Sequence, residues 1–224
     1  MANFTVKQSD RLFEARYKEP AFALIKSTSL HQNMFTNLSR HGLVRLNDIR
    51  VESGVTNLSD ANATYSISTI GAHVRVWLDR LEVFFLDGRA VDAKLMQQVP
   101  IAALNALRES LETLEIANYT IALTMHGHVE AIGAVEFIGR HTTNVPNGVG
   151  PITGGGVVFY FGPEGDRQSS SLTLDRSLLF SDAVYARAIV TFDGALEPEK
   201  AVVLSDDYLS QVFKTIDLSP PHHD

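Results

Sequence analysis

Short stretches in which apolar and polar residues alternate occupy much of this chain, and amphipathic helical patterns separate them. A period of two places every second side chain on the same face of a β-strand. Such stretches cover residues 11–17, 44–51, 65–69, 74–78, 81–85, 115–130, 157–161, 170–174 and 184–192. Because turn residues connect most of them, we predict a mainly antiparallel sheet.

Three longer segments have the periodicity of amphipathic helices. The first is predicted to begin at Pro20 and to end at Gly42, and the second covers residues 90–114 with an interruption at Pro100. The third is predicted to begin at Ser205, whose hydroxyl would cap its first turn, with the negative charges of Asp206 and Asp207 beside the N-terminus. A shorter helical pattern covers residues 134–141. We expect the amphipathic helices to pack on one face of the sheet.

The predicted elements follow the same order in both halves of the chain. Residues 1–112 and residues 113–218 each contain a strand, a helix, antiparallel strands and a second helix. We therefore predict an α+β fold of duplicated β-α-β-β-β-α units, although any α+β protein shows some repeated order. The boundary between the halves is apolar and has no polar linker, which favours one continuous body. Residues 219–224 are predicted to form a flexible tail.

Two local patterns predict the path of the strands. Val74, Val76 and Leu78 are apolar at even positions, whereas residues 81, 83 and 85 are apolar at odd positions. A β-bulge at Asp79 and Arg80 would keep one face apolar through this change of phase. Residues 163–167 are turn formers between two alternating stretches, so they predict a hairpin.

Composition excludes several functional classes. The formal net charge is −7 and no basic cluster is present, so we expect no nucleic-acid partner. The apolar runs are too short to span a bilayer, so we expect no membrane insertion. The first twenty residues are polar and charged, unlike an export signal, and the chain has no cysteine for disulfides or thiolate chemistry. A cytoplasmic location is the resulting expectation.

One histidine pair could bind a metal. On a strand, His126, His128 and Glu130 would lie on the same face, and two imidazoles with a carboxylate form an open ligand set for a divalent metal. A solvated strand face can also carry such residues without binding anything. We expect no other cofactor, since the glycine-rich residues 144–156 lack the lysine and the following helix of a phosphate-binding loop.

Trp77 is the candidate interface residue. It alternates with His73 and Arg75 on the side opposite Val74 and Val76, so a large aromatic group would stand on the less buried face of the sheet. The alternative is that the other half of the chain covers this face.

The serines at 169–171, 177 and 181 have no histidine near them in sequence and no nucleophile-elbow glycines, so a hydrolytic triad is not supported.

Together these patterns favour a non-enzymatic protein that acts by self-association, as a homo-oligomer, or by binding a protein partner. Trp77 and the glycine-rich loop would lie near the contact. Two alternatives stay open: a small metal-dependent enzyme or metal-binding protein that uses His126, His128 and Glu130, and a carrier of a small ligand held between sheet and helices.

Overall fold

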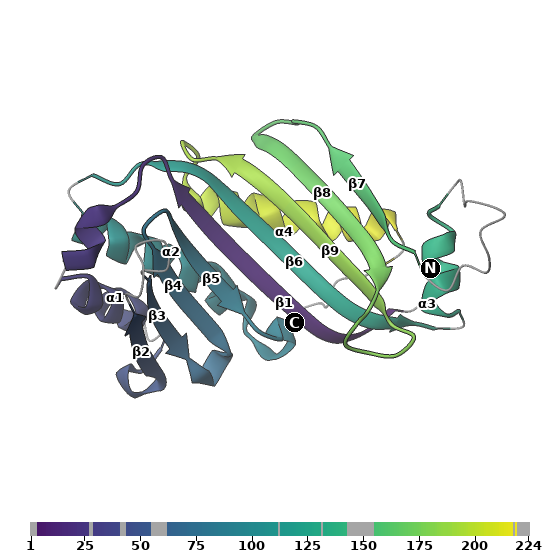
Figure 1. The fold of residues 1–224 in the computed structure, drawn as a ribbon, viewed down its shortest axis with the longest axis horizontal. Coiled ribbons are helices and arrows are strands. Elements are labelled where there is room, and N and C mark those ends of the chain that lie inside the picture. The colour runs from purple at the N-terminus through teal and green to yellow at the C-terminus, as the bar shows by residue number, and fades with distance from the viewer. Residues whose placement is uncertain are drawn as a thin grey trace.

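The computed structural model describes residues 4–26, 29–40, 44–54, 62–111, 113–130, 132–142, 155–216 and 218. These residues form one antiparallel sheet of nine strands, in the order β2-β3-β4-β5-β1-β6-β9-β8-β7, and four α-helices (Figure 1). The strands are β1 (Phe4–Tyr17), β2 (Ile49–Gly54), β3 (Asn62–Ile67), β4 (Ala72–Trp77), β5 (Arg80–Phe85), β6 (Ile116–Val129), β7 (Val157–Phe161), β8 (Arg167–Arg176) and β9 (Val184–Asp193). The predicted α+β class with a large antiparallel sheet is confirmed.

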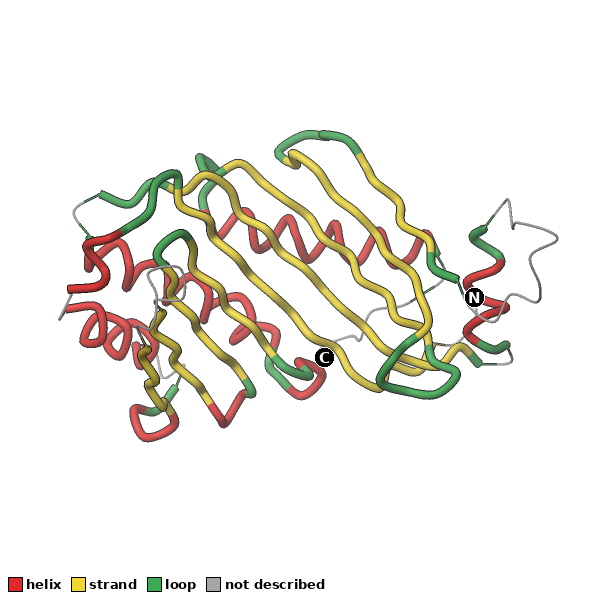
Figure 2. The backbone as a smooth tube through the Cα atoms, in the orientation of Figure 1, coloured by secondary structure: helices red, strands yellow, loops and turns green. Residues whose placement is uncertain are grey.

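The helices lie on one side of the sheet. In Figures 1 and 2, α2 (Ala93–Ser110) and α4 (Pro198–Thr215) run behind the strands, and α1 (Ser29–Ser39) packs against α2. The short α3 (Ala134–Gly139) lies at one end of the sheet. Four 3-10 helices complete the described elements: η1 (Phe22–Lys26), η3 (Leu46–Asp48), η5 (Ser68–Ile70) and η6 (Gly88–Ala90).

The core lies between the sheet and these helices. The strand register aligns Val74, Val83, Phe13, Ile121 and Val190 in one row across five strands, and all five are buried. Each buried side chain of this size contributes roughly 1.5–3 kcal/mol. The period-two patterns of the sequence thus place their apolar side toward the helices.

A hairpin, rather than a bulge, explains the change of phase near Asp79. Strands β4 and β5 pair antiparallel, with Val76 opposite Leu81, so Leu78 and Asp79 form the turn between them. A tight turn of two residues reverses the chain and keeps both apolar sets on the helix side. The prediction of a bulge was therefore wrong, and the first half of the chain contains one more strand than predicted.

The last helix begins earlier than predicted. It starts at Pro198, a residue suited to a first helical turn, and Ser205 lies inside it, buried, with its hydroxyl donating to the carbonyl of Val202 at 2.7 Å. Asp206 therefore lies in mid-helix, where it bonds to Gln97 of α2 and pairs with Arg11 of β1. The predicted cap at Ser205 was wrong because the helix already begins at Pro198, whose fixed φ and missing N–H suit a first turn.

Other predicted segments shift in their bounds. The helix predicted from Pro20 is η1 followed by α1, and residues 44–48 contain η3 rather than a strand. Helix α2 continues through Pro100 as one element. The predicted hairpin of β7 and β8 is present, with Gly165 at a φ of +57° in its turn. Gly42 and the predicted tail at 219–224 lie outside the described residues.

None of the helices that the structure describes is long and apolar enough to cross a membrane.

Candidate binding surface on the helix-free side of the sheet

No helix among the described residues covers the second side of the sheet, which faces the viewer in Figure 2. We call this side the helix-free face. Side chains on it come from every second residue of each strand. The register therefore arranges them in rows that cross the strands.

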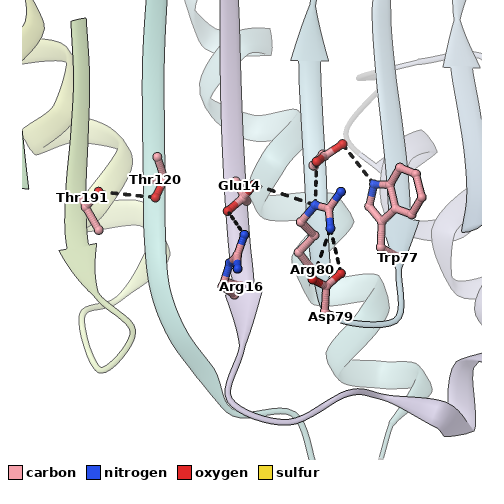
Figure 3. A network of polar contacts seen from close by, with 8 residues as sticks. Glu14, Arg16, Trp77, Asp79, Arg80, Thr120 and Thr191 are labelled. Atoms are coloured by element: carbon pink, nitrogen blue, oxygen red, sulfur yellow. Dashed lines mark hydrogen bonds and ion pairs between the residues drawn. The ribbon is translucent and has the colours of Figure 1, made fainter. Parts of the chain in front are cut away.

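A polar row crosses the middle of the sheet. Arg75, Glu82, Glu14, Thr120 and Thr191 lie side by side on neighbouring strands. The two threonine hydroxyls are 3.4 Å apart (Figure 3). Glu82 and Glu14 are opposite each other in this row; Arg75 pairs with Glu82, and Arg80 pairs with both glutamates.

Trp77 stands at the end of this polar network. Its indole N–H donates to Glu82 Oε2 at 3.0 Å, and the guanidinium of Arg80 lies over its ring at 4.6 Å (Figure 3). Arg80 in turn bonds to Glu82 at 2.7 Å and to Asp79 at 2.9 Å. The cation–π contact with Arg80 and the charge-assisted hydrogen bond to Glu82 hold the half-buried indole in place on the sheet. The structure thus places Trp77 on the helix-free face.

An apolar row lies next to the polar one. Phe84, Leu12, Ala122 and Ile189 are opposite one another on β5, β1, β6 and β9. Ala122 is buried and the other three are half-buried. Beyond Ile189 the row continues through Ser171 to Tyr160 on the outermost strand, β7. Four apolar side chains thus lie in line, and no helix of the described residues covers them.

A pocket opens at one end of the same face. The loop between β8 and β9 folds over the sheet there and, with the strands, encloses an open space of about 650 Å³. His126, only 7% exposed, forms its base beside the rings of Phe180 and Tyr185. The lining residues are His126, Asp175, Arg176, Ser177, Leu178, Leu179 and Tyr185.

Ser177 connects this loop to His126. Its oxygen accepts the backbone N–H groups of Leu179 and Phe180, both at 3.1 Å, so its single proton is directed to Nδ1 of His126 at 2.8 Å. A hydroxyl that donates to Nδ1 in this way favours the neutral imidazole. Burial lowers the pKa of His126, and the nearby charge of Asp10 partly opposes this shift.

This serine is better suited to holding the loop than to catalysis. Both lone pairs of the Ser177 oxygen are occupied by N–H donors, whereas an attacking hydroxyl needs one free. The sequence showed no histidine near Ser177, but the fold brings His126 to it from another strand. A serine beside a histidine is the residue pair of a nucleophile and its general base. Here the hydrogen bonds of Ser177 hold the loop on the sheet instead.

The predicted metal ligands have other contacts. His128 Nδ1 lies 3.3 Å from the carbonyl oxygen of Asp182, and Glu130 is exposed just beyond the end of β6. Within the described part of the chain, no group of three or more His, Asp or Glu side chains is placed to hold a metal ion. The metal site stays a prediction, and most of the glycine-rich loop at 144–156 lies outside the described residues.

Sequence reasoning missed Leu12, Phe84 and Ile189, and it considered Ser177 without its contact to His126. A lone apolar residue at an outward strand position is ordinary, and only the register shows that three of them are neighbours. The contact of Ser177 with His126 joins residues that are distant in sequence. Neither feature leaves a local signal.

No known family model matches this chain, and no curated protein is significantly similar to it in sequence. The geometry of the helix-free face is therefore the basis of the functional argument.

Proposed function

We propose that this protein is a non-enzymatic binding module whose helix-free face is covered by a protein partner, either another copy of the chain or a different protein. The observation that carries the proposal is the apolar row of Phe84, Leu12, Ala122 and Ile189 on a face without helices. Contiguous apolar residues at the surface of a folded monomer commonly mark an interaction site, and three residues of this row are partly exposed.

The surroundings of the row suit a protein interface. Interfaces combine an apolar centre with a polar rim, and tryptophan and arginine are the residues that contribute most to their affinity. Here Trp77, Arg75 and Arg80 lie beside the row with Glu82. Because the charges are already paired on the sheet, a partner would meet a preorganised surface and would lose little side-chain entropy on binding.

A photo-crosslinking experiment tests this proposal in the cells that make the protein. Benzoyl-phenylalanine replaces Phe84 in the apolar row and, as a matched control, Phe22, which is 58% exposed in η1. We expect a discrete adduct from position 84 and none of that mass from position 22. The mass of the adduct then identifies a second copy or another protein. Absence of an adduct at position 84, or the same adduct at both positions, would refute the proposal.

The pocket at His126 favours a second candidate function, the binding of a small ligand. Its volume of about 650 Å³ is within the range of small-molecule sites, and Leu178 and Leu179 line it beside the polar groups of Tyr185 and Asp175. A thermal-shift screen of small metabolites tests it, with elemental metal analysis on the same samples for the metal hypothesis. A ligand that raises the melting temperature of the wild type, and has no effect on a variant with Tyr185→Ala, would support it.

The internal duplication belongs to the same set of proposals. In support, the first strand of each half, β1 or β6, lies beside the last strand of its own half, β5 or β9. A long helix follows in both cases. Superposition of the halves, with β6, β9 and α4 on β1, β5 and α2, tests it.

A cytoplasmic location is likewise proposed from the composition, and cell fractionation tests it.

A further inference from the structure

The two edges of the sheet differ in chemical character. The edge strand β2 (Ile49–Gly54) carries the charged residues Arg50 and Glu52. The opposite edge strand, β7, consists of Val157–Phe161, with the sequence VVFYF and no charge, proline or glycine (Figure 1). Proteins usually protect an edge strand with charges, prolines or bulges, because its free N–H and C=O groups can pair with any other strand. Within the described part of the chain, none of these protections is found at the β7 edge.

The side chains of β7 are also exposed. Val158 is 45% and Tyr160 83% exposed, and their pairing with Thr173 and Ser171 places both on the helix-free face. Phe161, on the helix side, is 38% exposed. No other strand in the described part of the chain exposes consecutive aromatic residues at a free edge. With respect to the described residues, this strand therefore has both main-chain and side-chain groups available to a partner.

We propose that β7 pairs with β7 of a second copy, antiparallel, about a two-fold axis through Phe159, and joins the two sheets into one. Antiparallel pairing satisfies the main-chain groups of both edges. A two-fold contact uses the same surface on both copies, so the assembly closes as a dimer. This inference goes beyond the proposed function, since it concerns the edge and leaves the helix-free face available.

The residues of β7 suit this register. With Phe159 on the axis, Val158 lies opposite Tyr160 of the second copy, and Val157 lies opposite Phe161 of the second copy. Each contact places a β-branched residue against an aromatic one, a favourable cross-strand pair, and no charge is buried. The β7 strand of a second copy is thus complementary to β7, so no partner of different sequence is needed to cover this edge. Since the strand has five residues, we expect a reversible dimer of modest affinity.

A charge-swap pair tests the contact and its register. The variant with V158K and Y160K places lysine opposite lysine twice, so it should weaken dimerisation by about tenfold or more. The variant with V158K and Y160E places lysine opposite glutamate twice in the same register, so it should recover the dimer. Both positions are exposed, so neither variant should unfold. V135K with V203K is the matched control, since these residues are 43% and 53% exposed on α3 and α4 and lie in no proposed site.

The measurement is sedimentation equilibrium over a range of concentrations, with circular dichroism to confirm folding. A dimer in the wild type and in the control, lost with V158K and Y160K and recovered with V158K and Y160E, would support the inference. A wild type that stays monomeric, a lysine variant that dimerises like the wild type, or a lysine–glutamate variant without recovery would overturn it. None of these results depends on the adduct from position 84, so the two proposals can fail separately.

Discussion

The Ser177→Ala substitution should destabilise the protein measurably, although Ser177 lies in a surface loop. The hydroxyl takes part in three hydrogen bonds, two from the backbone of the loop and one to His126. A hydrogen bond contributes about 1 kcal/mol net, and a buried acceptor that loses its donor costs about 1–3 kcal/mol. The two loop amides can turn to water, since Leu179 is 60% exposed, whereas the ring of His126 is buried. We therefore expect a loss of about 2 kcal/mol, most of it from His126.

For a chain of this length, that loss lowers the melting temperature by about 4–8 °C. Urea unfolding followed by circular dichroism gives the free energy, and NMR of the imidazole gives the pKa of His126. This pKa should rise in the variant, because the serine proton stabilises only the neutral ring. Ser181→Ala, in the same loop and exposed, is the control. A stability within about 0.5 kcal/mol of the wild type, with an unchanged pKa, would show that the hydroxyl does not hold the loop.

Two further predictions concern pH and backbone packing. Burial lowers the pKa of His126 in the folded protein below its ordinary value of 6.5. The unfolded chain therefore binds the proton more tightly than the folded protein does. The contribution of neutral His126 to stability is complete above pH 6.5 and is lost as the pH falls through the lower pKa of the folded state. Melting curves from pH 7 downward should show this loss in the wild type and not in His126→Asn. A Cβ at Gly194 would lie 2.1 Å from the carbonyl oxygen of Ile116, whereas a Cβ at Gly139 meets nothing within 4 Å. Gly194→Ala should therefore lower the free energy of unfolding by about 2 kcal/mol or more, and Gly139→Ala should not; equal stabilities in urea would contradict the packing argument.

The sequence predicted much of the fold because period-two patterns and turn residues are local signals. The β7–β8 hairpin and the long strand β6 follow from such signals directly. The predicted bulge at Asp79 failed because a tight hairpin and a bulge produce the same change of phase. The predicted cap at Ser205 failed because a serine followed by acidic residues inside a helix resembles a helix start. In that case Pro198 was the stronger signal.

The candidate surface could be predicted only in part. Trp77 was assigned to the less buried side of its strand from alternation alone, and the structure places it on the helix-free face. The apolar row was not predictable, because it depends on how β5, β1, β6 and β9 align. The bond between Ser177 and His126 depends on the same long-range register. Contacts between distant segments are set by the packing of the whole sheet, which a single sequence does not reveal.

The position of β1 in the sheet has a consequence for how the chain reaches this structure. β1 lies between β5 and β6, and Phe4 is paired with Val129. Because β5 and β6 both follow β1 in the sequence, β1 has no strand partner until β5 is synthesised, and its other side stays unpaired until β6 follows. Such contacts between distant parts of a chain slow folding, because each must close a long loop before it stabilises anything. During synthesis β1 therefore stays unpaired while residues 18–79 are made, and unpaired strand edges of this kind make an incomplete chain prone to aggregation.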